Sequence, residues 1–398
     1  MAQNLLYYGD NLDVLRRHVP SDSVDLIYLD PPFKSNQDYN ILFKEKNGSP
    51  SQSQIRAFED TWQWDSAAAR AYEDVVEKGG RVSIALQALR KYLNETDMMA
   101  YLAMMAPRLV ELRRVLKETG SIYLHCDPSA SHYLKMLMDS VFGPGNFINE
   151  IVWRRSHTRS SISRRFRRAH DVILFYAKSS SYQFNMQYKE LSATTKKLYE
   201  NEDEHGCYQS VPLLVSGRRK GKTGHTWRGI DPNVRGKNGM HWVTMPGKLD
   251  EYEKQGLVLW PQKEGGIPRL KYYLEDTPGV PASDFWDDIP VIASSSPESL
   301  GYPTQKPLGV LERIIAAGSN EGDVVLDPFC GCGTTIAAAQ KMGRRWIGID
   351  TANVAITLAR RRLQDDFEDA VDYQTIAGGE QIGSGETLTT EQMLFAPG

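Results

Sequence analysis

The chain has 398 residues, of which 41% are hydrophobic and 24% charged, and a formal net charge of −3. These values are ordinary for a globular protein of one large elaborated domain or of two domains. They exclude a uniformly basic nucleic-acid binder, although a local basic patch remains compatible with them. The sequence has no apolar run near the roughly 18 residues of a membrane span and begins without a signal-peptide pattern, which predicts a cytoplasmic, nucleoid-associated protein.

Four cysteines are scattered along the chain, at Cys126, Cys207, Cys330 and Cys332. Without a secretory signal, this spacing does not indicate a disulfide framework. Cys330 and Cys332 are one residue apart, but no second pair with metal-ligand spacing accompanies them. We therefore expect no metal site and interpret these two cysteines as small side chains in a tight loop.

The first predicted elements are two strands with a helix between them. Residues 5–8 and 24–29 are short apolar runs that stop at glycine or proline, which is typical of buried parallel strands. Residues 11–18 have helical spacing of their apolar side chains. A strand–helix–strand order of this kind predicts an α/β sheet.

A long excursion follows at residues 34–96. It is polar and irregular at first and becomes helical at 66–76 and 82–92. Long segments at the carboxyl end of a strand usually serve a binding site. We therefore interpret this excursion as a lid or clamp.

Regular elements resume after the excursion. Residues 98–117 form a predicted helix whose stop signal is Thr119-Gly120. The strand 121–125, the helix 129–142 and the strand 172–176 complete this part of the predicted sheet.

The middle of the chain, residues 179–296, has a different texture. Glycine, proline, tryptophan and basic residues replace regular periodicity, which predicts a separate, mixed, loop-rich module. We interpret Trp227, Trp242, Trp260 and Trp286 as the core of this module, because it has few other large apolar residues.

Regular strand and helix patterns return after the module. The predicted elements there are a helix at 308–317, a strand at 324–326, a helix at 334–341, a strand at 346–349 and a helix at 352–363. The expected organisation is thus an N-terminal half-domain at 1–178, the module at 179–296, a C-terminal half-domain at 297–377 and a flexible tail at 378–398.

A glycine-rich loop, residues 327–335, lies between a predicted strand and a predicted helix, where doubly wound sheets bind ligands. Gly331 and Gly333 would let a ligand approach the backbone, and Asp350 ends the next strand, where it could accept both hydroxyls of a ribose. The loop lacks both the dinucleotide pattern and the lysine of a phosphate-binding loop. S-adenosylmethionine fits these features; taken alone, a glycine-rich turn beside a core aspartate fits them equally well.

A second motif, Asp30-Pro31-Pro32-Phe33, follows the strand 24–29. The prolines fix the backbone and leave carbonyl groups outside any helical ladder. A carboxylate and a rigid carbonyl can accept both hydrogens of an exocyclic amine, and Phe33 offers a stacking face for an extruded base. Taken alone, the tetrapeptide is equally consistent with a strand terminator and a buried aromatic residue.

Together, the two motifs resemble those of the amino-DNA methyltransferases, which make N6-methyladenine or N4-methylcytosine. The tetrapeptide precedes the glycine-rich loop by most of the chain, which resembles the β-class arrangement, a circular permutation of the usual Rossmann-like methyltransferase sheet. The resemblance covers most of residues 4–366, with the excursion and the module only loosely matched. Other matching segments are residues 8–11, 120–127, 170–171 and 302–307.

The resemblance implies a role for each matching residue. Asp10 would bind the adenine of S-adenosylmethionine and Asp350 its ribose. The residues that would line the methionine and nucleoside are Asp327, Phe329, Gly331, Gly333 and Thr334, and those that would close over the methionine are Thr304, Gln305 and Lys306. Aspartate at the first position of the tetrapeptide favours adenine over cytosine as the target, although it occurs in both groups.

Two basic segments are predicted to contact DNA phosphates. No acidic residue interrupts the first, whose members are Arg154, Arg155, Arg159, Arg164, Arg165, Arg167 and Arg168. The second lies in the module, which resembles the family's target-recognition domain, and comprises Arg218, Arg219, Lys220, Lys222 and Arg228.

The favoured function is site-specific methylation of adenine N6 in duplex DNA. The alternatives are cytosine-N4 methylation by the same fold, an RNA or protein methyltransferase, and a non-catalytic DNA-binding subunit. The permuted motif order and the arginine-rich segments argue against the RNA or protein enzyme, and the two intact motifs argue against the non-catalytic subunit. The resemblance also implies a homodimer, and we consider a cognate restriction endonuclease as a further partner; no recognition sequence is predicted.

Overall fold

The computed structural model describes residues 4–32, 39–44, 50–58, 63–155, 164, 166, 168–263, 265–293, 295–367 and 371–382, with the backbone alone at 39–44, 50–58 and 382. The chain divides into two compact units. We call Met1–Gln187 with Ala282–Gly398 the sheet domain, and Tyr188–Pro281 the inserted module. The module is thus shorter at both ends than the predicted 179–296, because residues beyond it pair or bond within the sheet domain.

The sheet domain is built on one sheet, in the order β16-β6-β7-β5-β2-β17-β18-β1-β19-β20 within the described residues. Neighbours from β5 through β2, β17, β18 and β1 to β19 run parallel, whereas β7 is antiparallel to both β5 and β6. The strand bounds are β1 Asn4–Tyr8, β2 Val24–Leu29, β5 Leu116–Cys126, β6 Phe147–Arg154, β7 His170–Ala177, β16 Phe285–Trp286, β17 Val324–Asp327, β18 Arg345–Asp350, β19 Tyr373–Ala377 and β20 Glu380–Ile382.

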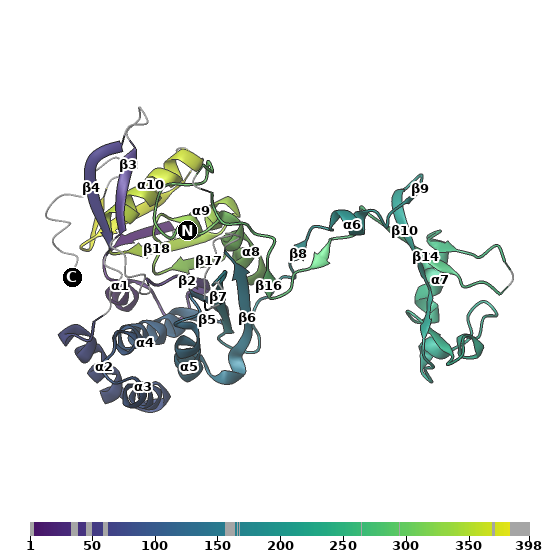
Figure 1. Ribbon diagram of the computed structural model, residues 1–398, viewed down its shortest axis with the longest axis horizontal. Coiled ribbons are helices and arrows are strands. Elements are labelled where there is room, and N and C mark those ends of the chain that lie inside the picture. Colours follow the sequence, from purple (N-terminus) through teal and green to yellow (C-terminus); the bar gives the residue numbers. More distant parts are fainter. Residues whose placement is uncertain are drawn as a thin grey trace. The chain divides into compact units, whose positions relative to one another are not determined.

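Helices cover both faces of this sheet (Figure 1). Strand β2 shows why: Ile27 and Leu29 enter one hydrophobic core, while Leu26 and Tyr28 enter the other. The first core is shared with α1 Asn11–His18, α2 Ser66–Lys78, α3 Gly80–Leu93, α4 Asp97–Val115 and α5 Ser131–Phe142, and the second with α8 Leu308–Gly318, α9 Thr334–Lys341 and α10 Asn353–Phe367. None of the described helices is both long and apolar enough to cross a bilayer.

The predicted helix 98–117 was too long. Helix α4 ends at Val115, and β5 begins at the next residue, so that Thr119-Gly120 lies inside a strand. The pairing of β2 with β5 shifts register after Val24, and a Cβ on Gly120 would lie 2.8 Å from the carbonyl oxygen of Asp25. Gly120 therefore permits a close approach at a β-bulge instead of ending a helix.

Two hairpins occupy segments that the sequence did not predict as strands. Strands β3 Tyr39–Lys44 and β4 Pro50–Phe58 pair antiparallel within the excursion, where irregular chain was expected. At the predicted start of the tail, Gly378 and Gly379 take φ of 58° and 86° and turn β19 into β20. Two successive residues with positive φ are the signature of a two-residue hairpin turn. Residues 383–398 of the predicted tail lie outside the described residues.

The inserted module has its own small core. Its sheet has the order β13-β14-β10-β9, and shorter pairs join β11 to β12 and β8 to β15. Trp227 and Trp242 are buried there, whereas Trp260 stacks on Trp227 but is 44% exposed, and Trp286 lies in the core of the sheet domain. The bounds are β8 Tyr188–Lys189, α6 Ala193–Lys196, β9 Asn201–Asp203, β10 Gly206–Pro212, β11 Leu214–Ser216, β12 Met240–Trp242, α7 Pro246–Lys254, β13 Val258–Leu259, β14 Arg269–Tyr273 and β15 Val280–Pro281.

Candidate active site

Three acidic residues mark the ends of neighbouring parallel strands. Asp30 follows β2, whereas Asp327 and Asp350 are the last residues of β17 and β18. The three strands lie side by side, so their carboxyl ends meet at one edge, which is where α/β sheets bind ligands. This edge brings together Asp30, the first residue of the predicted catalytic tetrapeptide, and the predicted cofactor loop, which are far apart in the sequence.

The glycine-rich loop is pinned to the end of β18. The backbone N–H of Gly331 donates to Asp350 Oδ2 at 2.9 Å, and that of Ala352 donates to Oδ1 at 2.8 Å. Burial raises the pKa of Asp350 to about 6, although the backbone N–H groups partly oppose this rise. A carboxylate has about four acceptor sites, and the backbone N–H groups of Ala352, Gly331 and Thr351 use three of them, so Asp350 can still accept a hydrogen bond from a ribose hydroxyl.

Asp327 braces the loop from inside. Its Oδ1 accepts from the N–H of Phe329 at 3.0 Å and its Oδ2 from the hydroxyl of Thr335, and the side chain is buried. Burial raises the pKa of Asp327 to about 7 despite these hydrogen bonds. Thr334, also buried, accepts from Arg362 of α10 at 2.9 Å. Both side chains therefore hold the shape of the loop.

The two glycines of the loop each allow a different neighbour to pack closely against the backbone. Gly331 has φ 50°, and a Cβ on it would lie 3.2 Å from the ring of Tyr302. Gly333 has φ 79°, and its Cβ would lie 2.9 Å from the Cβ of Ala359 in α10. Gly333 thus allows the loop to pack on a helix, and Gly331 allows the segment that carries Tyr302 to approach the loop.

A polar network joins the end of β1 to this loop. Asp10 caps α1 by accepting from Leu12 and Asp13, and its Oδ2 accepts from Arg108 at 2.6 Å. Arg108 also donates to Asn11 Oδ1 at 2.6 Å, and Asn11 Nδ2 donates to the carbonyl of Pro328 at 2.8 Å. The contacts of Arg108 and Asn11 could not be predicted from sequence patterns, because their partners Asp10 and Pro328 are remote in the chain.

Asp30, the carboxylate predicted to be catalytic, is paired with a lysine. Lys306 Nζ donates to Asp30 Oδ2, and also to the carbonyl of Thr304 at 3.3 Å. Thr304 has φ 63°, and the amide of Gln305 bonds the N–H of Leu300 and the carbonyl of Glu298, so the turn holds its own shape. Of the three residues predicted to close over the methionine, Lys306 contacts Asp30 and Gln305 bonds its own segment.

A chain of buried side chains begins at Tyr28, two residues before Asp30. The hydroxyl of Tyr28 is 2.9 Å from His125 Nδ1, and His125 Nε2 is 3.3 Å from Asp171 Oδ2. Arg155 Nε lies 3.2 Å from the other oxygen of Asp171. Burial tends to raise the pKa of Asp171, but the hydrogen bond from His125 and the neighbouring positive charges bring it below its ordinary value. This chain links the end of β2 to Arg155 of the arginine-rich segment.

The loop cysteines are buried and free. Burial raises the pKa of both Cys330 and Cys332, which favours neutral thiols. The described residues contain no group of three histidine, cysteine or acidic side chains placed to hold a metal ion.

The predicted DNA-contacting residues are only partly described. Phe33 of the tetrapeptide and three arginines lie outside the described residues; these are Arg159, Arg165 and Arg167. Arg168 lies beside Asp127 and donates to Ser129, and in the module Arg228 pairs with both Asp250 and Glu253. The remaining charges of the second basic segment are exposed, at Arg218, Arg219, Lys220 and Lys222.

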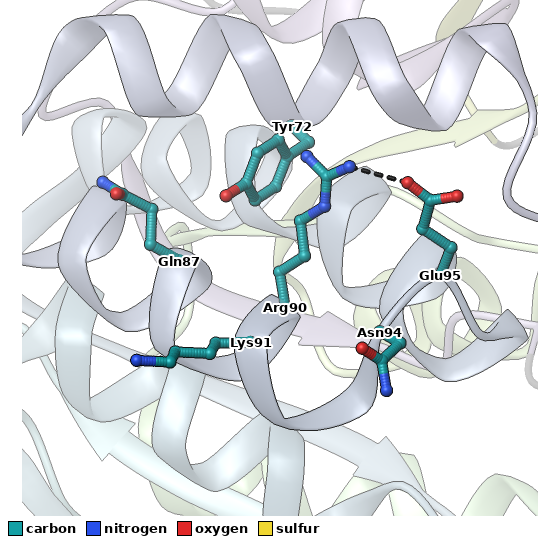
Figure 2. Close-up of a pocket in the computed structure, with 6 residues that line it drawn as sticks. All are labelled: Tyr72, Gln87, Arg90, Lys91, Asn94 and Glu95. Atoms are coloured by element: carbon teal, nitrogen blue, oxygen red, sulfur yellow. Dashed lines mark hydrogen bonds and ion pairs between the residues drawn. The ribbon is translucent and has the colours of Figure 1, made fainter.

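A pocket of about 600 Å³ lies elsewhere, between α2 and α3 (Figure 2). Arg90 points across it, with its guanidinium 4.6 Å from the ring of Tyr72 and 2.7 Å from Glu95. The lining shares no residue with the candidate active site; it consists of Tyr72, Gln87, Arg90, Lys91, Asn94 and Glu95.

The residues at the sheet edge fit S-adenosylmethionine. Asp350 is partly exposed and retains capacity for hydroxyl donors, and Gly331 presents backbone without a side chain. The loop carries no cation for a phosphate, and Lys306 supplies a cation on the neighbouring turn. These features match a ribose and an amino acid carboxylate.

Fold and site together define an α/β methyltransferase that uses S-adenosylmethionine. The sequence model of the N6/N4-type DNA methylase family matches residues 24–361. The chain therefore belongs to the DNA methylase family. This match confirms the family, the α/β methyltransferase fold and the cofactor that the two motifs predicted.

Two relatives match most of the chain. The Type II methyltransferase M.EcaI of Enterobacter cloacae is 32% identical over 91% of this chain and 70% of its own length. The Mod subunit of the Type III restriction-modification enzyme StyLTI, from Salmonella typhimurium, is 28% identical over 86% of this chain. The chain spans 50% of that Mod subunit's length.

Solved structures of DNA methyltransferases align with nearly the whole chain. The cytosine-N4-specific PvuII enzyme covers 92% of this chain, with 89% of its own length aligned, 14% identity and a TM-score of 0.43. The complex of M1.HpyAVI with S-adenosylmethionine covers 91%, with 99% of its own length aligned, 15% identity and a TM-score of 0.41.

Proposed function

We propose that this protein methylates the N6 amine of adenine in duplex DNA by direct transfer from S-adenosylmethionine to a flipped base. The observation that carries the proposal is the adjacency of β2 and β17, which places the carboxylate of Asp30 beside the glycine-rich loop. A methyl acceptor held by Asp30 would thus lie next to the methyl donor.

The chain's own residues would orient the amine. S-adenosylmethionine supplies a methyl group already activated on sulfonium, so no covalent enzyme intermediate is needed. Asp30 would accept one N–H of the amine and a carbonyl of the Pro-Pro turn the other, which keeps the nitrogen lone pair out of the aromatic ring. Pro31 is buried and Pro32 half-buried, so the turn is rigidly held. Phe33 would stack on the extruded base.

Adenine is favoured over cytosine by the aspartate at the first position of the tetrapeptide. Both bases present an exocyclic amine, and Asp30 could hold either one. Cytosine-N4 methylation by the same site is therefore the second candidate.

The proposed substrate is duplex DNA, which would bring the protein to the nucleoid. The two basic segments would contact phosphates, and the inserted module would read the sequence. We also propose a homodimer. One relative is named as the Mod subunit of a Type III restriction-modification enzyme, so a cognate endonuclease is a further proposed partner.

The test uses purified protein, methyl-labelled S-adenosylmethionine and unmethylated duplex DNA, with RNA and protein as alternative acceptors. Nucleoside analysis of the digested DNA should give N6-methyladenine from the wild type and none from Asp30→Ala. Recovery of N4-methylcytosine would establish the second candidate. Label in RNA or protein, but not in duplex DNA, would refute the proposal.

A further inference from the structure

From the contact between Lys306 and Asp30, we infer that Lys306 is a two-position residue. It holds the catalytic carboxylate before the cofactor binds, and it then moves to the methionine carboxylate of S-adenosylmethionine, which releases Asp30 to take the target amine. The inference rests on the proposed function, and it adds a coupling between the two binding events.

The first position is the one seen in the structure. The side chains of Lys306 and Asp30 are only 14% and 25% exposed, so water screens their attraction incompletely. The ammonium occupies Oδ2 of the carboxylate that must accept a hydrogen from the amine. A carboxylate engaged in this way is a weaker acceptor for a second donor.

The ammonium must leave Asp30 for chemical reasons. As the methyl group moves to the amine, positive charge develops on the amine nitrogen. The carboxylate of Asp30 stabilises that charge, whereas an ammonium bound to the same carboxylate opposes it. The ion pair between Lys306 and Asp30 stabilises the site before the cofactor binds, but it would raise the barrier to methyl transfer if it persisted in the complex.

The second position follows from where the lysine is anchored. The turn that carries Lys306 lies against the glycine-rich loop, because the ring of Tyr302 lies 3.2 Å from where a Cβ of Gly331 would stand. The turn is fixed by the amide of Gln305, so the flexible four-carbon stem of Lys306 can move while the backbone stays in place.

Two other cations near the loop, within the part of the chain that the structure describes, already have partners. Arg108 bonds Asp10 and Asn11, and Arg362 bonds Thr334. Lys306 shares its ammonium between a carbonyl and the one carboxylate that the reaction requires. The methionine carboxylate is the anion that would arrive with the cofactor, and it offers Lys306 a new partner.

The inference predicts an unusual effect of a catalytic-site substitution. In the wild type, the cofactor must draw Lys306 away from Asp30. In Asp30→Asn this contact is weakened, so the cofactor should bind more tightly, by roughly three- to tenfold for an ion pair worth about 1 kcal/mol. Lys306→Met should bind the cofactor more weakly than the wild type.

The experiment measures equilibrium binding by titration calorimetry with the full chain. S-adenosylhomocysteine is the ligand that carries the amino-acid carboxylate, and 5′-methylthioadenosine is the comparison ligand that lacks the whole amino-acid part. The proteins are the wild type, Asp30→Asn, Lys306→Met and the double variant, each checked by thermal melting. We expect Asp30→Asn to tighten binding of the first ligand only, and to have no such effect when Lys306 is already methionine.

Two results would overturn the inference. An unchanged affinity of Asp30→Asn for S-adenosylhomocysteine would show that Lys306 need not leave Asp30. A gain that persists in the Lys306→Met background would show that Asp30 repels the ligand carboxylate directly. Neither result depends on methyl transfer, so failure of the inference is distinct from failure of the wild type to methylate DNA.

Discussion

At the scale of the residue, Asp350 should make cofactor binding depend on pH. Its pKa is raised to about 6 by burial, and ribose hydroxyls would donate to its ionised form. The cofactor therefore favours the charged state, and its affinity should fall by up to about tenfold per pH unit below pH ~6. Calorimetric titration of S-adenosylhomocysteine between about pH 5 and 8 measures this dependence.

The matched variant is Asp350→Asn, which cannot ionise. It should bind the cofactor more weakly at neutral pH and lose the component of the pH dependence centred near the pKa of Asp350. An affinity profile with the same slope in the wild type and the variant would contradict a ribose contact from Asp350. Asp327 remains in both proteins, so its own titration cancels in the comparison.

Asp327 should make the protein less stable as the pH rises, whereas most carboxylates make a protein less stable as the pH falls. Burial raises its pKa in the folded protein from 3.8 to about 7, so the folded state holds the proton more tightly than the unfolded state. Its contribution to stability is fully present below the unfolded pKa and is lost as the pH rises through the folded pKa. Since each pKa unit corresponds to about 1.4 kcal/mol, the loss should reach a few kcal/mol.

Chemical denaturation at about pH 5, 6, 7 and 8 measures the loss. Asp327→Asn can still accept from Phe329 and bond Thr335, so it should flatten the profile and be the more stable protein at the alkaline end. A wild-type stability that rises steadily over this range would contradict the raised pKa.

The residues that could be predicted from the sequence belong to short contiguous motifs at the ends of predicted strands. Asp30 and Asp350 each follow or end a strand, and their positions at the sheet edge follow from strand patterns alone. The contact of Lys306 with Asp30 could not be predicted, because it depends on how a turn in the C-terminal half-domain packs on the N-terminal half-domain. Arg108 was missed for the same reason: its helical spacing says nothing about its partner Asp10.

At the scale of the element, periodicity predicted most strands and helices of the sheet domain. The helix α9 and the strand β2 have the predicted bounds, because each has a clear apolar pattern between glycine, proline or acidic boundaries. The predicted boundary between α4 and β5 was wrong for two reasons. Leu116 fits the apolar spacing of the helix as well as that of the strand, and glycine occurs both at helix ends and at β-bulges. Only pairing with β2 distinguishes these two roles of Gly120.

That role of Gly120 can be tested by Gly120→Ala. The new Cβ would lie 2.8 Å from the carbonyl of Asp25 and 2.6 Å from the side chain of Leu116, so β2 and β5 must separate. We expect a loss of about 1–3 kcal/mol in the free energy of unfolding, as for other overpacked sites. The control is Gly145→Ala, where a Cβ meets nothing within 4 Å. Equal stability of the two variants in urea would refute the close approach.

At the scale of the whole molecule, the sheet domain is assembled from both sides of the inserted module. Strand β2 pairs with β17, and β1 with β18 and β19, so the edge that carries the site requires both parts of the chain. The permuted motif order predicted this arrangement. The antiparallel direction of β7 between β5 and β6 was not predictable, because short apolar runs carry no information about strand direction.

The charge distribution of the whole molecule leads to the last prediction. The net charge is −3, yet Arg218 and Arg219 are both exposed within a basic run of the module. If these two arginines contact phosphates, the double variant Arg218→Ala/Arg219→Ala should bind duplex DNA more weakly than the wild type. The plot of log affinity against log salt concentration should also become less steep, by about two units of slope. Lys341→Ala is the control, because Lys341 lies on α9 and pairs with Glu312 at 2.7 Å. Fluorescence anisotropy between about 50 and 200 mM salt measures both slopes. An unchanged slope in the double variant would place the phosphate contacts elsewhere. Thermal melting of the double variant is the folding control, because misfolding of the module would lower both the affinity and the melting temperature.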